Sequence, residues 1–457
     1  MVKPAAGRGW QPYAAYRDSG VEWLGPVPAH WPLRRLKYLA AIRPSNVDKH
    51  SVEGQTEIRL CNYIDVYNND RIADGLDFMR ATATDEQIRT FELRADDVLI
   101  TKDSETWTDI AVPAHVPLDL PGVVCGYHLA LLRPRAQHLR GDYLFWLLAS
   151  RRINHQFAIA ANGITRFGLS TDAITGAWLP CPDVAEQRAI TAFLDRETAR
   201  IDALVEKKQR LIALLREKRQ AVITRAVTRG LDPNVPMKDS GVEWLGEVPA
   251  HWGVLRTKFV ARLESGHTPS RQHPEYWVDC TIPWFSLADV WQIRGGRMDY
   301  VHETAEKVSE LGIKNSAARL LPKGTVIVSR TASVGFSAIL GLDMATTQDF
   351  VNWVCGPRIR PEYLLYVFRS MENEFRRLTM GSTHQTIYMP DVGRFTTPLP
   401  PLDEQDAIAA YIRRETSRID ALVAKIERAI ALLREHRQAL ITAAVTGQID
   451  VRDEVPA

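Results

Sequence analysis

Histidines and paired carboxylates are the side chains of this sequence whose types could support acid–base chemistry. His30 and His251 each precede a tryptophan in a repeated segment, while Asp202 and Glu206 lie one turn apart on a predicted helix. A recurring histidine beside tryptophan favours a packed joint over a general base, since both copies would otherwise need a substrate. The two acids, with Arg210 nearby, favour a solvated helix face. These residues predict no active site.

The motifs that hold nucleotides and metals are missing from the sequence. There is no GxxxxGK[ST] loop, no GxGxxG and no HExxH, and the twelve histidines never pair at metal-ligand spacing. The Pro400-Pro401 pair follows Leu399, whereas an amino-methyltransferase has Asn or Asp there to hold the amino group of its target base. We therefore predict no catalytic and no metal-binding residues in this chain.

Length and composition are those of a globular protein with two or three domains. The chain has 457 residues, of which 45% are hydrophobic and 25% charged, and its net charge is +2. Five scattered cysteines indicate reduced thiols, without a disulfide framework or zinc module. The first residues lack the apolar core of a signal peptide, and the run at 144–149 is too short for a membrane span. We expect a soluble cytoplasmic protein.

The chain contains much of its own sequence twice. Residues 17–31, RDSGVEWLGPVPAHW, match residues 238–252, KDSGVEWLGEVPAHW, at thirteen of fifteen positions. Residues 186–228 match residues 404–446 at thirty of forty-three positions, including RETARIDALV against RETSRIDALV. Matches of this length do not arise by chance, so the chain is an internal duplication.

Two segments with little mutual identity lie between the repeated blocks. Strand-like VLITK at 98–102 is similar to VIVSR at 326–330, and helix-like DYLFWLLAS at 142–150 is similar to EYLLYVFRS at 362–370. We therefore expect one fold in both segments. The predicted domains are a first repeated segment at 1–31, a variable domain at 32–180, a long helix at 181–230, the second repeated segment at 231–252, a second variable domain at 253–400, and a long helix with a tail at 401–457.

Two long helices are the clearest structural prediction. Glycine and proline are absent from 183–229 and from 402–446, and ~40 helical residues would extend roughly 60 Å. Apolar residues recur at spacings of three and four, which is typical of a coiled-coil seam. Lys208 takes the seam position of Ile426, which favours the helices packing on each other over two independent amphipathic helices. The predicted seam residues are Ile201, Leu204, Leu211, Leu215 and Val222, then Ile419, Leu422, Ile426, Ala429, Leu433 and Leu440.

Positive charge is concentrated on these helices. Residues 196–229 hold ten Lys/Arg and four Asp/Glu, a net +6, and residues 413–446 hold seven and four, a net +3. Because the whole chain carries +2, the remainder carries 2 − 9 = −7. The variable segments are slightly acidic on balance, so any basic surface there is local.

The repeated motifs resemble those of the specificity subunits of type I restriction–modification systems, the HsdS family. The resemblance is carried by GVEWLG-x-VPAHW before each variable segment and by EQ…RET-x-RIDALV…LLRE-x-RQA-x-IT after it. It covers essentially the whole chain, in the order of the family. The resemblance implies two target recognition domains, each reading half of a bipartite DNA sequence, and an antiparallel helical spacer that holds them apart.

The resemblance also implies the partners of the chain. They are double-stranded DNA, two methyltransferase subunits and, in the full complex, a restriction subunit, with no membrane. S-adenosylmethionine, ATP and Mg would bind to those subunits and no cofactor to this chain, which would be non-catalytic. The partners could also neutralise DNA phosphates that the slightly acidic variable segments do not. Trp23 and Trp31, which recur as Trp244 and Trp252, predict core packing beside the helices, with a methyltransferase docking surface as the alternative.

Polar loops at matching places in the two halves are the candidates for reading bases. Arg and Lys recognise guanine, Asn and Gln recognise adenine, and Ser and Thr contact either. Each single residue has an ordinary surface loop as its alternative, but the loops as groups favour DNA. The candidates are Lys102, Ser104, Thr106, Asn162, Thr165, Arg166, Thr268, Ser270, Arg330, Thr331, Ser333, Thr347, Gln348, Ser382, Thr383 and Gln385, with Arg151, Arg152, Arg376 and Arg377 as phosphate contacts.

The predicted architecture is α+β, with two similar recognition domains joined by an antiparallel coiled-coil spacer in a pseudo-twofold internal repeat. The predicted function is to direct a type I complex to a gapped DNA target. Two other functions stay open at this point. One is a coiled-coil scaffold that bridges proteins without touching DNA, and the other is a nuclease that would cleave DNA with a metal ion on its own.

Overall fold

The computed structural model describes residues 10–379 and 386–454 and is α+β, as predicted. The chain divides into two compact units: unit 1 comprises residues 1–207 and 429–457, and unit 2 comprises residues 208–428. Two long helices, α7 (Val184–Arg229) and α12 (Leu402–Val445), contribute residues to both units, and they extend over the stretches that lack glycine and proline. No described helix is long and apolar enough to cross a bilayer.

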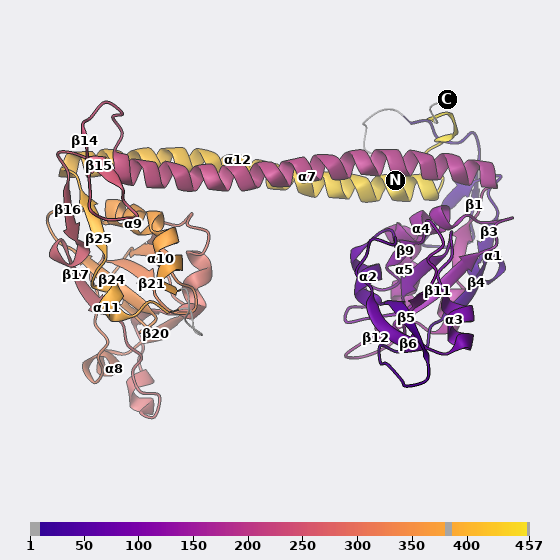
Figure 1. Ribbon diagram of the computed structural model, residues 1–457, viewed down its shortest axis with the longest axis horizontal. Coiled ribbons are helices and arrows are strands. Elements are labelled where there is room, and N and C mark those ends of the chain that lie inside the picture. The colour runs from indigo at the N-terminus through magenta and orange to yellow at the C-terminus, as the bar shows by residue number, and fades with distance from the viewer. Residues whose placement is uncertain (1–9, 380–385, 455–457) are drawn as a thin grey trace. The chain divides into compact units, whose positions relative to one another are not determined.

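Unit 1 is built on an antiparallel sheet with strand order β4-β11-β7-β9. Strand β7 (Val98–Thr101) is buried along its whole length, as an unbroken apolar run predicts. Helix α4 (Gly141–Ala149) packs against β7, β9 and β11 (Figure 1). The other sheet strands are β4 (Ala40–Pro44), β9 (Pro113–His115) and β11 (Leu129–Pro134).

A second, three-stranded sheet of order β10-β5-β6 completes unit 1, with β10 parallel to β5. The remaining elements of unit 1 are β1 (Tyr16–Asp18), β2 (Pro26–Pro28), β3 (Leu33–Arg35), α1 (Leu36–Leu39), β5 (Thr56–Cys61), α2 (Tyr63–Asn68), β6 (Met79–Ala83), α3 (Asp85–Phe91), β8 (Asp103–Ser104), β10 (Val123–Cys125), α5 (Arg151–Ala160), β12 (Phe167–Gly168), α6 (Thr171–Thr175), β13 (Trp178–Pro180) and η4 (Arg452–Glu454).

Unit 2 has the same plan. Its main sheet, β17-β24-β21-β22-β19, contains the antiparallel counterparts of the four strands of unit 1, and its second sheet, β20-β18-β23, again has one parallel pair. Strand β21 (Val326–Ser329) and helix α9 (Pro361–Ser370) lie where β7 and α4 predict them. The remaining elements are β14 (Met237–Asp239), β15 (Glu247–Pro249), β16 (Gly253–Arg256), η1 (Thr257–Phe259), β17 (Ala261–Ser265), η2 (Pro274–Trp277), β18 (Ile282–Phe285), η3 (Leu287–Gln292), β19 (Tyr300–Val301), β20 (Glu306–Val308), α8 (Glu310–Lys314), β22 (Ser337–Leu340), β23 (Ala345–Thr346), β24 (Phe350–Cys355), α10 (Glu372–Thr379), α11 (Met389–Val392) and β25 (Thr396–Leu399).

The repeated histidines belong to packed joints, as predicted. In unit 1, Nε2 of His30 lies 3.0 Å from Oε2 of Glu186 at the start of α7. In unit 2, Nε2 of His251 lies 2.9 Å from Oε2 of Glu404, at the start of α12. The adjacent tryptophans, Trp31 and Trp252, are fully buried, which confirms the predicted core packing at these two positions.

A glutamine next to each of these glutamates ties the long helix to its unit. The buried amide of Gln187 donates to the carbonyl oxygens of His138 and Pro182, both at 2.9 Å, and accepts from the backbone N–H of Arg140 at 3.0 Å. Gln405 makes the same three contacts in unit 2, with Arg358, Pro400 and Arg360. Each amide satisfies backbone groups that burial would otherwise leave unpaired.

The buried stripe of the long helices differs in part from the predicted seam. Leu204, Leu211 and Leu422 are exposed, so their assignment to the seam is wrong. The less exposed positions, at spacings of four and three, are Thr198, Ile201, Val205, Lys208, Ile212, Leu215 and Arg219 on α7, and Ile412, Thr416, Ile419, Val423, Ile426, Ile430 and Leu433 on α12. Polar and β-branched residues occupy several positions of this stripe. The prediction chose leucines for the seam, and three of these leucines lie on the neighbouring, exposed face.

Each unit contains one ion pair between α7 and α12. In unit 1, Nε of Arg437 lies 3.0 Å from Oδ1 of Asp202. In unit 2, Nε of Arg219 lies 3.2 Å from Oδ1 of Asp420. Residues 202 and 219 occupy the positions that residues 420 and 437 occupy in the repeat, at the offset of 218. The two ion pairs are therefore the same contact with the roles of the helices exchanged.

Candidate nucleic-acid interface

In unit 1, the loop after β7 meets two other segments at one end of the sheet. The backbone N–H of Lys102 donates to the carbonyl oxygen of His128 at 3.0 Å, and the carbonyl oxygen of Lys102 accepts from Leu169 at 2.8 Å. Strands β8 and β12 pair here as well. The two loops predicted to bind DNA, 102–107 and 162–167, therefore lie side by side. We call residues 102–107, 126–128 and 162–169 corner 1.

The charged groups of corner 1 are arranged around one carboxylate. Asp103 accepts from Nε and Nη2 of Arg166 at 3.1 and 2.5 Å, and its other oxygen lies 2.8 Å from Nδ1 of His128. Nζ of Lys102 donates to a backbone carbonyl at 3.1 Å and lies 4.4 Å from the ring centroid of Tyr127. Burial lowers the pKa of Lys102, and Asp103 partly offsets this effect. The side chains of Lys102 and Arg166 are thus held in place by contacts within the protein.

The reading candidates of corner 1 differ in their exposure. Thr106, Asn162, Thr165 and Arg166 face solvent. Ser104 is only 5% exposed, and its hydroxyl accepts from the backbone N–H of Thr106 at 3.3 Å. Ser104 therefore shapes the loop instead of presenting a hydroxyl to a ligand, which corrects its place among the candidates.

Unit 2 has a matching arrangement, corner 2, at residues 267–271, 330–333, 346–349 and 386–387. The backbone N–H of Arg330 donates to the carbonyl oxygen of Asp349, and Ile387 donates to the carbonyl oxygen of Arg330, both at 2.8 Å. Nε of Arg330 donates to the carbonyl oxygen of Gln348 at 3.0 Å. The hydroxyl of Thr268 donates to Oε1 of Gln348 at 2.7 Å. Thr268, Arg330 and Gln348 are thereby brought together.

The other candidates of unit 2 occupy varied places. Thr331 forms an isolated β-bridge with Thr386, and the backbone N–H of Ser333 donates to the carbonyl oxygen of Thr331. Thr347 is 5% exposed and its hydroxyl donates to Asp349, so it holds the turn and faces no ligand, a second correction. Ser270 is exposed, and its backbone carbonyl oxygen accepts from the indole N–H of Trp277. Ser382, Thr383 and Gln385 lie outside the described residues.

The phosphate candidates are not alike. Arg151 and Arg152 are exposed at the start of α5. Arg376 and Arg377 pair with Glu372 and Glu374 on their own helix, which favours an ordinary solvated helix face over a phosphate contact for them. Within residues 10–379 and 386–454, no three His, Cys, Asp or Glu side chains are grouped so that they could hold a metal ion.

Comparison of the corners identifies residues that sequence reasoning missed. Tyr127 and His128 precede β11 as Gln348 and Asp349 precede β24, and each turn closes on the basic residue after the central strand. We selected Gln348 from the sequence but not its counterpart. Aligning the two turns by the hydrophobic strands that follow them, LALLRP and FVNWVC, would have found the pair. Asp103, the acid between two basic groups, was also missed.

The comparisons with known proteins identify the class of this fold. Residues 249–431, which include corner 2, match the family model of the type I restriction modification DNA specificity domain. This part of the chain is therefore similar to the DNA specificity domains of that family.

Curated relatives extend the similarity beyond this domain. The specificity subunit of the type I restriction enzyme MjaIX from Methanocaldococcus jannaschii is 28% identical over 170 residues, covering 37% of this chain and 38% of that protein. That of EcoR124I/EcoR124II from Escherichia coli is 25% identical over 267 residues, covering 56% and 59%. The matched regions thus span about two to three fifths of these relatives. The specificity subunit of MjaVIII, also from M. jannaschii, is 20% identical over 445 residues, covering 93% and 95%.

Two solved structures share the fold. One is a chain from a study of the structural basis of complex assembly and conformational transition of the type I R-M system. It has a TM-score of 0.70 and 19% sequence identity, and the match covers 93% of this chain and 99% of that chain. The crystal structure of the HsdS subunit from Thermoanaerobacter tengcongensis has a TM-score of 0.52, also with 19% identity, covering 93% and 98%. The resemblance to the HsdS family predicted from the sequence is confirmed: this chain is a relative of the type I specificity subunits.

Proposed function

We propose that this chain is the DNA specificity subunit of a type I restriction–modification complex and that each unit reads one half of a bipartite DNA sequence. The observation that carries the proposal is the pair of corners. The two corners have the same backbone contacts but carry different side chains at the equivalent positions. These are Lys102, Tyr127 and His128 in corner 1, and Arg330, Gln348 and Asp349 in corner 2. A common scaffold with different hydrogen-bonding side chains suits the reading of two different half-sites.

The spacer is a further part of the proposal. The buried stripe of four-and-three spacing and the two equivalent ion pairs support an antiparallel coiled coil of α7 with α12. The side chains of Arg219 and Asp420 are 15% and 22% exposed. An ion pair open to solvent stabilises by about 0–1 kcal/mol and burial adds a desolvation cost, so the apolar stripe is expected to contribute most of the association. Such a spacer would keep the distance between the half-sites constant.

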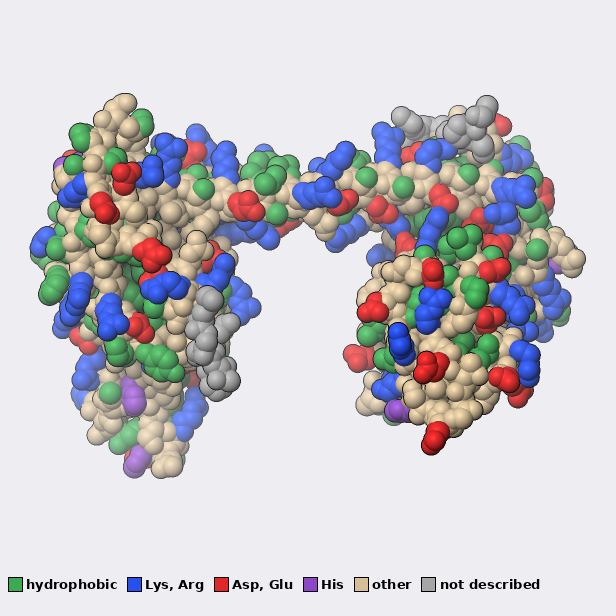
Figure 2. Space-filling view, viewed as in Figure 1, with side chains coloured by type: hydrophobic (Ala, Val, Ile, Leu, Met, Phe, Trp, Pro, Cys, Tyr) green, Lys and Arg blue, Asp and Glu red, His purple; other side chains and the backbone are tan. Residues whose placement is uncertain are grey.

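The chain itself would be non-catalytic, and its partner subunits would carry out the reactions. Two methyltransferase subunits would supply S-adenosylmethionine chemistry, and a restriction subunit would supply ATP- and Mg-dependent chemistry. Figure 2 shows Lys and Arg side chains spread along both long helices, consistent with the net +6 and +3 of these segments. The alternative of a protein scaffold that never touches DNA has no support among the relatives, which are specificity subunits.

Modified-base sequencing of host DNA, with and without the gene for this chain, tests the proposal. We expect methylated adenine at a gapped, two-part sequence to disappear when the gene is deleted and to return with a plasmid copy. Methylation that persists unchanged would contradict the specificity function. DNA cleavage by the purified chain with a metal ion would contradict the non-catalytic assignment.

A further inference from the structure

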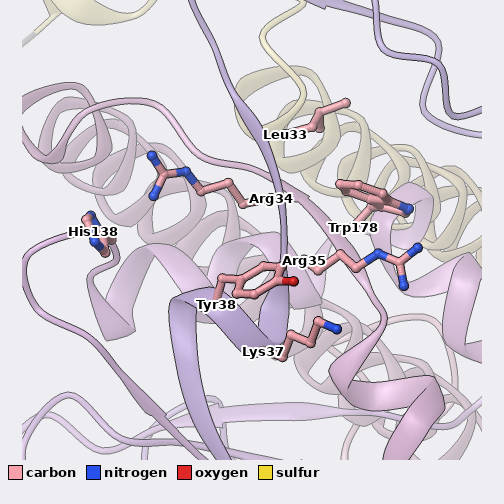
Figure 3. A pocket seen from close by; sticks show the side chains of 7 residues that line it. All are labelled: Leu33, Arg34, Arg35, Lys37, Tyr38, His138 and Trp178. Carbon is pink, nitrogen blue, oxygen red and sulfur yellow. The ribbon is translucent and has the colours of Figure 1, made fainter.

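A basic groove of about 700 Å³ lies on unit 1, away from corner 1. Figure 3 shows the ring of Tyr38 between Arg34 and His138 on one side and Arg35, Lys37 and Trp178 on the other. Tyr38 is 58% exposed, and the guanidinium of Arg35 lies 4.9 Å from the ring centroid of Trp178. We call this surface groove 1.

A second groove, of about 480 Å³, lies at the equivalent place on unit 2. Lys258 and Phe259 line it as Lys37 and Tyr38 line groove 1, at the offset of 221 that relates the repeated segments. Arg358 lies in groove 2, and its carbonyl oxygen accepts from Gln405 as that of His138 accepts from Gln187. We call this surface groove 2.

The likeness of the two grooves is not explained by packing. The variable segments share little identity overall, yet a lysine followed by an exposed aromatic ring is present in both at the offset of 221. Phe259 is 65% exposed, so neither ring contributes a full side chain to a core. An exposed pair kept in both copies indicates that each groove binds the same kind of ligand.

The cations of the grooves are available to such a ligand. Within the described part of the chain, no ion pair is formed by Arg34, Arg35, Lys37, Lys258 or Arg358. In groove 2, Arg262 is paired with Glu264. The lining residues of both grooves include no Asp or Glu. A ligand with negative charge and an apolar group would match this surface.

The grooves and the corners lie at opposite ends of the same strands. In unit 1, Pro44 pairs with Ala130 at the end near corner 1, and Ala40 pairs with Pro134 at the end near groove 1. In unit 2, groove 2 includes the far end of the same two strands, where Ala261 pairs with Cys355, and it extends along them as far as Leu263 and Val354. Five residues of strand extend roughly 15 Å, so in unit 1 the ligand of groove 1 is distinct from the DNA segment at corner 1.

We propose that groove 1 and groove 2 each bind one acidic segment, with an apolar anchor side chain, of a protein that attaches to this chain in two copies. The inference rests on the proposed function, in which two methyltransferase subunits attach. It adds the surface and the chemistry of that attachment. The apolar anchor would pack on Tyr38 or Phe259, and the acids would pair with the free Lys and Arg side chains.

The test uses the full chain, co-expressed with the methyltransferase subunit of its host system, and measures the mass of the complex by analytical ultracentrifugation. The groove 1 variant is Lys37→Glu with Tyr38→Ala, and the groove 2 variant is Lys258→Glu with Phe259→Ala. All four residues are exposed, so folding should be unaffected. Lys307→Glu with Trp291→Ala, an exposed pair outside both grooves, is the matched control.

We expect two methyltransferase copies on the wild-type chain and on the control, one on each groove variant and none on the combined variant. Each altered site should bind at least about tenfold more weakly. Tyr38→Phe, which gives groove 1 the ring of groove 2, should bind normally. Two copies on every variant would overturn the proposal.

Two other outcomes are distinguishable. Unchanged mass with a salt dependence of DNA binding reduced by about one unit of slope per lost cation would assign the grooves to DNA phosphates, against the proposal. A wild-type chain that binds no methyltransferase would contradict the proposed function itself, and with it the role of the grooves.

Discussion

The two corners place different side chains on one backbone framework. Arg330 has the planar fork that binds guanine through two hydrogen bonds, and Gln348 has the amide that suits adenine. Their counterparts, Lys102 and Tyr127, offer a point charge and a phenol. At the scale of single residues, the half-sites should therefore differ in base composition although the loops are built alike.

Arg330→Ala should relax specificity at one position of the second half-site. The loss of a two-bond contact with a base is expected to cost about 1–3 kcal/mol at that base pair. Modified-base sequencing of cells that express the variant reports the change. Arg294→Ala, an exposed arginine of the same unit, is the control. An unchanged methylated sequence would remove Arg330 from the reading residues.

Ile164 should contact a thymine methyl group in the first half-site. It is 96% exposed on a hairpin closed by backbone hydrogen bonds between Asn162 and Gly168 and by Gly163, whose φ of +152° and close backbone neighbours exclude a side chain. The methyl of thymine is the apolar group of the major groove. Replacing one thymine by deoxyuridine should weaken wild-type binding about fourfold, by ~0.8 kcal/mol.

The Ile164→Ala variant should not distinguish thymine from deoxyuridine at that position. Titrations of the complex at one salt concentration measure both affinities. Leu118→Ala, which truncates another exposed apolar residue of unit 1, should retain the full difference. Equal sensitivity of wild type and Ile164→Ala at every thymine would exclude the contact.

Among the elements, the long helices show both the strength and the limit of sequence reasoning. Their existence followed from the absence of glycine and proline, a local property. Strand β7 and helix α9 followed from local apolar patterns. The orientation of the buried stripe did not follow, because Lys208 and Arg219 bury their stems within it. Corner residues such as His128 were missed because strand pairing, which is non-local, brings them to the site.

Deleting one heptad from both helices, residues 208–214 and 426–432, should shorten the gap between half-sites and leave the half-sites intact. Seven residues of helix correspond to about 10 Å, the length of about three base pairs. The methylated sequence measures the gap. A deletion in α7 alone should instead mismatch the seam and lower stability. An unchanged gap after the paired deletion would contradict the spacer.

The whole molecule combines a repeated framework with two divergent reading ends. The joints of Glu186 and Gln187, and of Glu404 and Gln405, fasten each unit to a helix end by the same contacts. The residues between the joints can therefore change without altering the framework. This arrangement predicts that the units read DNA independently.

Replacing residues 253–400 by the corresponding segment of another relative should change one half-site only. The joint side chains lie outside the exchanged segment, which supplies only the backbone groups that Gln405 binds, so the chimaera should fold. Sequencing of methylated DNA gives the new target. A change in both half-sites would show that the units do not read independently, and exchange of 32–180 provides the reciprocal experiment.

The placement of corner and groove toward opposite ends of the strands has an evolutionary consequence. Mutations that retarget one end of a sheet leave the other end in contact with the same surroundings, so a lineage can acquire a new specificity without a compensating change elsewhere. Selection can then diversify the recognition ends rapidly while purifying selection maintains the opposite ends. The divergent corners and the matching grooves within this one chain are the record expected of that history.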